Sequence, residues 1–213
     1  MPGMGAKSDI FNGLRFPKDL EIHPMEWLLP EAEEDFLHYA ARLVDKFRVE
    51  PDSVLVGMSL GGVMVSEIGK LMPVYMPVFI STVKSHKELS PRYRMARVMH
   101  LWNFLPYGLI ARPERLKPYV ILKTVKKRIR LYERYMGIHD RAYFKWAIKN
   151  FLLWKHDLPD GPYLHIHGTR DYIFPYSYLK GEIIPVEGAA HLAVMTHPFA
   201  INRILREHLF SQL

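Results

Sequence analysis

Cysteine is absent from this chain of 213 residues, and so are long hydrophobic runs. The lack of cysteine excludes disulfides, a thiolate nucleophile and cysteine-ligated metal sites. No apolar run reaches the roughly 18 residues that mark a membrane-spanning helix. Residues 1–9 also lack the uninterrupted apolar stretch of a secretion signal. We therefore expect a cytoplasmic protein without a transmembrane segment.

Acidic residues are scarce in one part of the sequence. Residues 84–158 hold 18 of the 29 Lys and Arg residues but only 5 of the 22 Asp and Glu residues, so this segment carries +13 and the remainder −6. A basic middle within an acidic frame indicates an inserted unit with its own surface character. The charge is either the solvated face of long helices or an attraction for an anionic substrate, acyl carrier or lipid head group. No nucleic-acid-binding motif accompanies it.

The rest of the composition is typical of a folded globular chain, with 49% hydrophobic and 24% charged residues. The length fits one domain, or one domain with an insertion. Strands are predicted at residues 20–27, 53–57, 78–81, 163–167 and 182–186. Helices are predicted at residues 36–47, 60–71, 91–104, 113–136, 140–154 and 197–209. Strands alternating with helices predict an α/β fold with a mostly parallel, doubly wound sheet.

A G-x-S-x-G motif lies between a predicted buried strand and a predicted helix, as Gly57-Met58-Ser59-Leu60-Gly61. Glycines on both sides of the serine allow the tight turn and close backbone approach that expose its hydroxyl. The N–H of Leu60 would point toward a developing oxyanion. The motif therefore predicts a serine nucleophile.

A serine nucleophile needs a base and a group that orients the base. His191 follows the last predicted strand, and Asp171 follows the strand before it. Glu187 is a rival for the orienting carboxylate, whereas Asp160 precedes its strand and fits less well. Because open α/β sheets form their sites at the carboxyl ends of parallel strands, we expect Ser59, Asp171 and His191 to meet there.

With these motifs in the order Ser, Asp, His, the sequence resembles the α/β-hydrolase superfamily. The resemblance covers a core of residues 1–85 and 159–213, with residues 86–158 corresponding to a helical lid. It implies that Ser59 is the nucleophile, that His191 is the general base and then acid, and that Asp171 orients His191.

The resemblance also assigns an oxyanion loop, Pro2-Gly3-Met4-Gly5-Ala6, whose donor is the N–H of Met4 paired with that of Leu60. In the family this loop follows a third strand, and two further strands precede that one. The sequence begins at Met1, so we expect the N-terminal strands to be missing or truncated, the native start to lie upstream, and Met4 to lie on a frayed terminus.

The basic insertion is rich in aromatic residues, most of which would pack the lid onto the core. We predict that Met58, Trp102, Trp146 and Trp154 line a pocket over the serine. An apolar pocket within a basic exterior favours an ester or thioester with an apolar acyl group, delivered with an acidic carrier or anionic head group. No cofactor or metal is required.

Two alternatives stay open: a catalytically silent binding protein for a small apolar ligand, and a protein whose basic lid docks on anionic lipid. A third, weaker alternative is a metal pair at His165 and His167, which share one face of a strand but lack evident further ligands.

Overall fold

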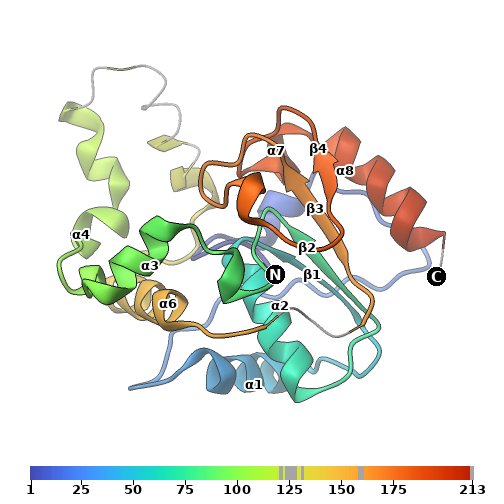
Figure 1. Ribbon diagram of the computed structural model, residues 1–213, viewed down its shortest axis with the longest axis horizontal. Helices are drawn as coiled ribbons and strands as arrows, with labels where there is room; N and C mark the ends of the chain where they lie inside the picture. The colour runs from blue at the N-terminus through green and yellow to red at the C-terminus, as the bar shows by residue number, and fades with distance from the viewer. Residues whose placement is uncertain (120–121, 123–128, 131, 158–160, 212–213) are drawn as a thin grey trace.

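The computed structural model describes residues 1–119, 122, 129–130, 132–157 and 161–211. Within these residues one parallel sheet forms, with its strands in chain order (Figure 1). The strands are β1 (Val54–Met58), β2 (Met76–Ile80), β3 (Leu164–Gly168) and β4 (Ile184–Val186). They confirm four of the five predicted strands to within two residues at either end. The α/β fold class is likewise confirmed.

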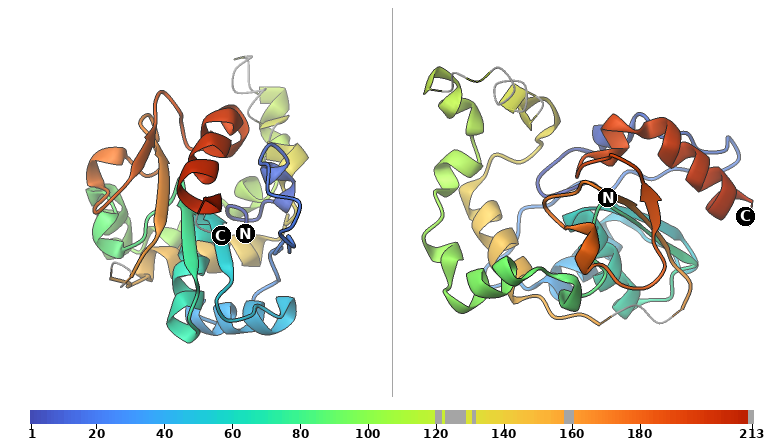
Figure 2. Two further views of the ribbon diagram at one scale, coloured as in Figure 1. Left: turned by 90° about the vertical axis from the view of Figure 1, so that its right-hand side faces the viewer. Right: turned by 45° about the horizontal axis from the view of Figure 1, so that its top comes forward.

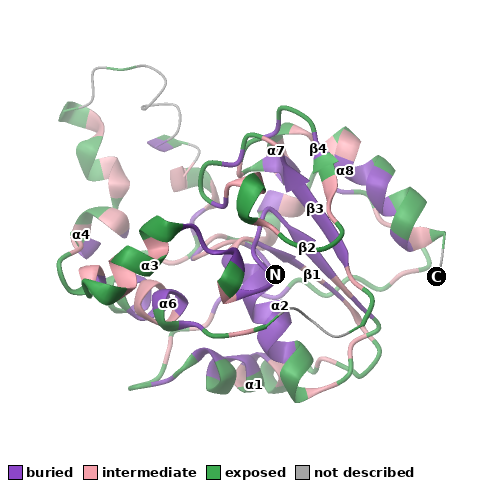
Figure 3. Ribbon diagram, viewed as in Figure 1, coloured by how far each residue is buried: buried purple, intermediate pink, exposed green. Residues whose placement is uncertain are grey.

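Helices cover both faces of the sheet. On one face α1 (Phe36–Phe47) and α2 (Leu60–Leu71) pack against Leu55 and Phe79. On the other face α7 (Ala193–Thr196), α8 (Pro198–Leu205) and the π-helical turn η6 (Arg206–Phe210) pack against alternate strand residues that include Val78 and Ile166. Figure 2 shows the C-terminal helices across the strands from α1 and α2. The sheet is therefore doubly wound, with its strands and α2 in the buried core (Figure 3).

Short helices and turns fill the described part of residues 86–157, apart from an isolated bridge between Ala6 and Met136. In Figure 1 they lie to one side of the sheet. These elements are η2 (His86–Glu88), α3 (Pro91–Val98), η3 (Leu101–Asn103), α4 (Tyr107–Ile110), η4 (Pro113–Tyr119) and α6 (Arg141–Leu153). The predicted helix 91–104 is interrupted because His100 adopts a left-handed conformation. The predicted helix 113–136 lies partly outside the described residues.

The strand predicted at residues 20–27 is wrong, because this segment is irregular. Part of the outer edge of β1 is occupied by Met1, whose amino group donates to the Val56 carbonyl and whose carbonyl accepts from the Met58 N–H at 3.1 Å. Residues 20–27 are bonded elsewhere: the Trp27 indole N–H donates to the Gly3 carbonyl at 2.7 Å. Beyond the rest of the β1 edge is a cavity of about 970 Å³.

The predicted fraying of the N-terminal loop is also wrong. The Gly3 carbonyl accepts a second hydrogen bond from the Ala6 N–H, at 2.9 Å. The Gly5 N–H donates to the Tyr143 hydroxyl at 2.9 Å, and the Gly5 carbonyl accepts from the Gly137 N–H at 2.8 Å. Tertiary contacts therefore fix the loop.

Every helix in the described ranges is too short or too polar to cross a bilayer.

Candidate active site

Ser59 occupies a strained turn between the end of β1 and the start of α2. Its φ and ψ are 53° and −124°, a region that costs a residue with a side chain about 1–3 kcal/mol. The flanking glycines permit the turn: a Cβ on Gly57 would lie 2.5 Å from the Gly61 carbonyl oxygen, and one on Gly61 would lie 2.3 Å from the Met1 carbonyl oxygen. The strand-to-helix position predicted for the motif is the one observed.

The three residues predicted to form a triad meet at the carboxyl ends of the strands. The His191 Nε2 atom lies 2.9 Å from the Ser59 hydroxyl oxygen, and its Nδ1 atom lies 2.8 Å from Asp171 Oδ2. The loops after β3 and β4 are bonded to each other, since the Arg170 N–H donates to the Ala189 carbonyl at 2.9 Å. That bond fixes the loop bearing Asp171 against the loop bearing His191.

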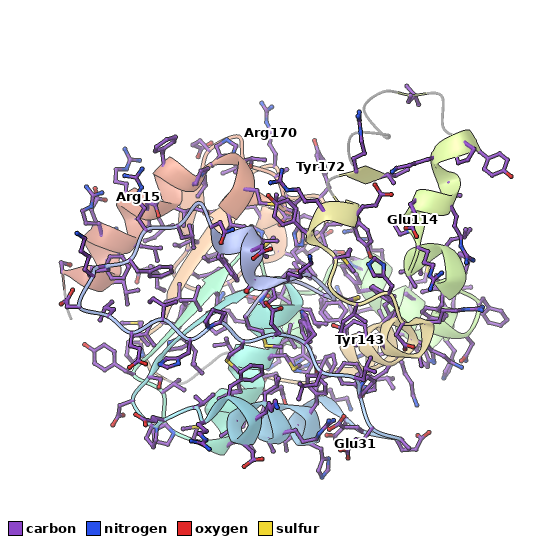
Figure 4. The ribbon with its side chains drawn as sticks, turned by 180° about the vertical axis from the view of Figure 1, so that it is seen from behind. Arg15, Glu31, Glu114, Tyr143, Arg170 and Tyr172 are labelled. Carbon is purple, nitrogen blue, oxygen red and sulfur yellow. The ribbon has the colours of Figure 1, made fainter. Side chains whose placement is uncertain are left out.

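Asp171 is buried, although Arg170 beside it projects from the surface (Figure 4). Burial by itself raises the pKa of the Asp171 carboxyl, but hydrogen bonds from His167, His191 and the Phe174 N–H outweigh it and hold that pKa well below its usual range. The second oxygen, Oδ1, accepts from the N–H groups of Ile173 at 2.7 Å and Phe174 at 3.0 Å. Asp171 is therefore an ionised, fixed carboxylate.

The rival carboxylates are placed differently. Glu187 accepts a hydrogen bond from the Thr169 hydroxyl at 3.3 Å, and its described contacts do not include His191. Asp160 lies outside the described residues. Of the carboxylates considered from the sequence, Asp171 is the one seen at the imidazole.

Two backbone N–H groups near Ser59 are without an acceptor in the described part of the chain. Leu60 is the first residue of α2, where an N–H has no intrahelical acceptor. Met4 lies in the loop that passes Ser59: a Cβ on its neighbour Gly3 would lie 3.4 Å from the Ser59 Cβ. No hydrogen bond from the Met4 N–H is found among the described residues. Both groups are free to receive a negatively charged oxygen.

The aromatic residue in contact with His191 was not predicted from the sequence. The centroid of the Phe174 ring lies 5.5 Å from that of the His191 imidazole. The ring centroids of Tyr93 and Phe151 lie 5.9 Å and 5.7 Å from that of Phe174. Phe174 is only three residues after Asp171, which is the signal that could have found it. Tyr93 and Phe151 come from the helical segment of residues 86–157 and carry no local signal.

The predicted pocket residues are all buried, and their described contacts lie away from Ser59 and His191. Met58 packs with the core on the α8 face of the sheet. The Trp146 indole N–H donates to the Glu34 carbonyl, and the Trp154 indole N–H donates to the Glu67 carboxylate. The Trp102 ring packs against His100. Their place in a substrate pocket stays a prediction.

A basic pocket of about 360 Å³ lies between the helical segment of residues 86–157 and Lys180, which is in the loop before β4. Its floor includes Leu89, Tyr93 and Leu152, and its charged or titratable lining is His86, Lys87, Arg94, Arg97 and Lys180. Through Tyr93 and Phe174 this pocket is two ring contacts from His191.

Comparison with protein-family models and with curated proteins finds no match. Solved structures do match. MGS-M2, an α/β hydrolase enzyme from a Medee basin deep-sea metagenome library, is 14% identical, with a TM-score of 0.63 over 100% of this chain and 88% of that one. A thermophilic esterase from Thermogutta terrifontis is 17% identical, with a TM-score of 0.62 over 99% of this chain and 88% of that one.

A bromoperoxidase from Bacillus anthracis is 17% identical, with a TM-score of 0.53 over 85% of this chain and 77% of that one. Although the sequence identities are low, the backbone similarity extends over most of each chain. The chain therefore has the α/β-hydrolase fold, with a parallel sheet of four strands in the described residues.

Proposed function

We propose that this chain is a serine hydrolase that cleaves an ester or thioester through a covalent acyl-enzyme. The observation that carries the proposal is the pair of distances at His191, 2.9 Å to the Ser59 hydroxyl and 2.8 Å to the Asp171 carboxylate. A hydroxyl, an imidazole and a carboxylate in this order are the parts that acyl transfer requires.

In the first half of the reaction the Ser59 oxygen attacks the acyl carbon while its proton passes to His191 Nε2. The negative charge on the former carbonyl oxygen is held by the N–H groups of Leu60 and Met4. The bond to the leaving group then breaks, and His191 returns the proton to the departing oxygen or sulfur. In the second half a water molecule gives its proton to His191, attacks the acyl carbon and releases the acid, and Ser59 recovers its proton.

We assign an apolar acyl group to the substrate because Phe174, Tyr93 and Phe151 form an aromatic cluster beside the imidazole. The basic pocket beyond Tyr93 suits an anionic part of the same substrate or of its carrier.

Labelling by a fluorophosphonate tests the chemistry, because the probe bonds to an activated serine. We expect rapid labelling of the wild type, none of Ser59→Ala and little of His191→Gln. In a separate assay, we expect the unlabelled wild type to hydrolyse chromogenic esters faster as the acyl chain lengthens. A folded wild type that resists the probe would establish the alternative, a silent binding protein with the same fold.

A second candidate function, docking of the lid on an anionic membrane surface, is favoured by one specific observation. In the described part of the lid, nine large apolar side chains are exposed among its basic residues, namely Met95, Val98, Met99, Phe104, Leu109, Leu116, Tyr119, Leu122 and Leu153. Exposed apolar groups beside Lys and Arg are typical of surfaces that bind anionic lipid.

Sedimentation with vesicles tests the docking. We expect binding to vesicles of phosphatidylserine and phosphatidylcholine, weaker binding at high salt, and little binding to phosphatidylcholine alone. Equal sedimentation with both lipid compositions would remove the electrostatic part of this candidate.

A further inference from the structure

A chain of buried polar side chains continues from Asp171 into the protein, away from Ser59. His167 Nε2 lies 3.2 Å from Asp171 Oδ2, the same oxygen that contacts His191. His167 Nδ1 lies 3.3 Å from His165 Nε2, and His165 Nδ1 lies 2.7 Å from the ammonium of Lys84. Lys84, His165 and His167 are at most 1% exposed. Burying three such groups in contact is costly unless every proton has an acceptor.

This series of polar contacts begins at the Lys84 ammonium, in which every proton has a hydrogen-bond acceptor. The Lys84 ammonium contacts Glu88 Oε1 at 2.9 Å, the Lys180 carbonyl at 3.0 Å and His165 Nδ1 at 2.7 Å, one acceptor for each of its three protons. The Glu88 carboxylate also accepts from the N–H groups of Lys84 at 2.7 Å and Lys180 at 2.9 Å. Burial lowers the pKa of the Lys84 ammonium, and the charge and hydrogen bond of Glu88 oppose this. Because each of its three protons has an acceptor, we assign Lys84 as protonated.

Because an ammonium only donates, the direction of every later hydrogen bond follows from Lys84. His165 Nδ1 must accept, so the His165 proton is on Nε2, which faces the Thr82 carbonyl at 3.2 Å and His167 Nδ1. His167 Nδ1 must then accept, so the His167 proton is on Nε2. That N–H makes its hydrogen bond to the Phe174 carbonyl, 2.9 Å away, and Asp171 Oδ2 lies 3.2 Å from the same nitrogen as a second, longer contact.

Burial is the main reason that the pKa of His165 lies well below its usual range, and the nearby charge of Lys84 adds to it. His165 is therefore neutral at pH 7. The other titratable groups near these polar side chains include Tyr163, whose ring centroid lies 5.3 Å from the Lys84 ammonium, and Tyr176, whose ring lies 6.3 Å from that of His167. Tyr93 and His191 lie near Asp171.

We propose that Lys84, His165 and His167 are positioning residues for the reaction at Ser59: they fix one proton arrangement in which His167 donates to the Asp171 carboxylate and holds its Oδ2 toward His191. This inference rests on the proposed function. The three residues act through Asp171 and do not touch the reacting atoms. With Oδ2 held between two imidazole N–H groups, His191 keeps its own proton on Nδ1, and its Nε2 stays free to accept from Ser59.

Substitutions at His167 separate positioning from simple core packing. His167→Leu removes the N–H that faces Asp171, whereas His167→Gln keeps an amide N–H near the Nε2 position. Losing a donor makes the Asp171 carboxylate a stronger acceptor for protonated His191. We expect His167→Leu to raise the apparent pKa of the acid limb of kcat/KM by about half a pH unit or more and to lower kcat about 10-fold. His167→Gln should bring both the apparent pKa and kcat most of the way back to their wild-type values.

Two further variants complete the test. Lys84→Met combined with Glu88→Gln removes both partners of the buried ion pair together and leaves the His165 tautomer unfixed. We therefore expect this double variant also to raise the apparent pKa of the acid limb and to lower kcat. His156→Leu is the matched control: His156 contacts Glu67 at 3.4 Å and stacks on Trp154, outside the chain of contacts to Asp171. It should leave the pH profile unchanged.

NMR of the histidine ring nitrogens in the wild type reads the proton arrangement without any assay of activity. We expect the proton on Nε2 in both His165 and His167 and on Nδ1 in His191. A proton on Nδ1 of His167 overturns the inference, and so does a folded His167→Leu chain with the wild-type pH profile. A wild type that the fluorophosphonate fails to label instead overturns the proposed function, which the NMR result does not decide.

Discussion

The polar residues at the carboxyl ends of β3 and β4 and a set of apolar residues in the helical segment of residues 86–157 lie in opposite environments. At the ends of these strands the polar groups of His167, Asp171 and His191 are largely withdrawn from water, and each contacts a protein partner. In the helical segment large apolar side chains such as Phe104 and Tyr119 are more than three-quarters exposed. The polar residues are held in a fixed geometry, whereas the exposed apolar side chains are the basis for the membrane docking proposed above.

The largest expected effect on activity comes from substitution of Ser59. Replacement by alanine should lower kcat about 10⁴-fold or more and abolish fluorophosphonate labelling, because no other group supplies the nucleophile. Replacement by glycine should lose activity equally while raising the free energy of unfolding by about 1 kcal/mol, because glycine relieves the strain of φ 53°. Activity assays and urea unfolding check both. If the glycine variant is no more stable than the alanine variant, the inferred backbone strain at Ser59 is contradicted.

Asp171→Asn should lower kcat on the order of 10³-fold to 10⁴-fold, because the amide no longer selects the His191 tautomer that accepts from Ser59. The matched variant is Glu187→Gln, which changes the rival carboxylate by the same atoms and should keep nearly full activity. Steady-state kinetics of the two variants decide between the carboxylates, and the reverse ranking would make Glu187 the orienting group.

In a chain that starts at Met1, the buried amino group of this residue makes stability depend on pH. Burial lowers its pKa to about 5, although the charge of Glu26 opposes this. The unfolded chain therefore binds this proton below about pH 8 and the folded chain only below about pH 5, so the free energy of unfolding falls by up to about 4 kcal/mol as the pH drops from 8 to 5. Denaturant unfolding across this range measures the slope. An acetylated N-terminus has no amine to titrate and should reduce it, and equal slopes would contradict the buried amine.

The smallest expected effect is on the proposed vesicle binding by the helical segment of residues 86–157. Arg94→Glu combined with Arg97→Glu should weaken binding to phosphatidylserine vesicles about 30-fold or more, on the basis of roughly 1 kcal/mol for each Lys or Arg near an anionic surface. Arg203→Glu combined with Arg206→Glu on the C-terminal helices changes net charge equally and should leave binding nearly unchanged. Vesicle sedimentation gives both values, and equal losses would reduce the effect to net charge alone.

Most of the regular core could be predicted from the sequence because its signals are local. The apolar spacing of α1 and the short apolar runs of β1 to β4 reflect which side chains each element buries, and the glycines around Ser59 reflect a turn that side chains would block. Residues 20–27 have a strand-like sequence and form no strand in the structure, because pairing depends on a free neighbouring edge that no local signal reveals.

The sequence by itself determined the order of the elements, the serine turn and the three residues that a hydrolase of this fold would use. Only the tertiary structure decided that Asp171 rather than Glu187 lies at His191, that Phe174 lies against the imidazole, and that Lys84 is linked through His165 and His167 to Asp171. The physical reason is distance along the chain. Lys84 and Asp171 belong to different loops, and the energy that joins them comes from burial and hydrogen bonding, which exist only after the sheet has brought those loops together.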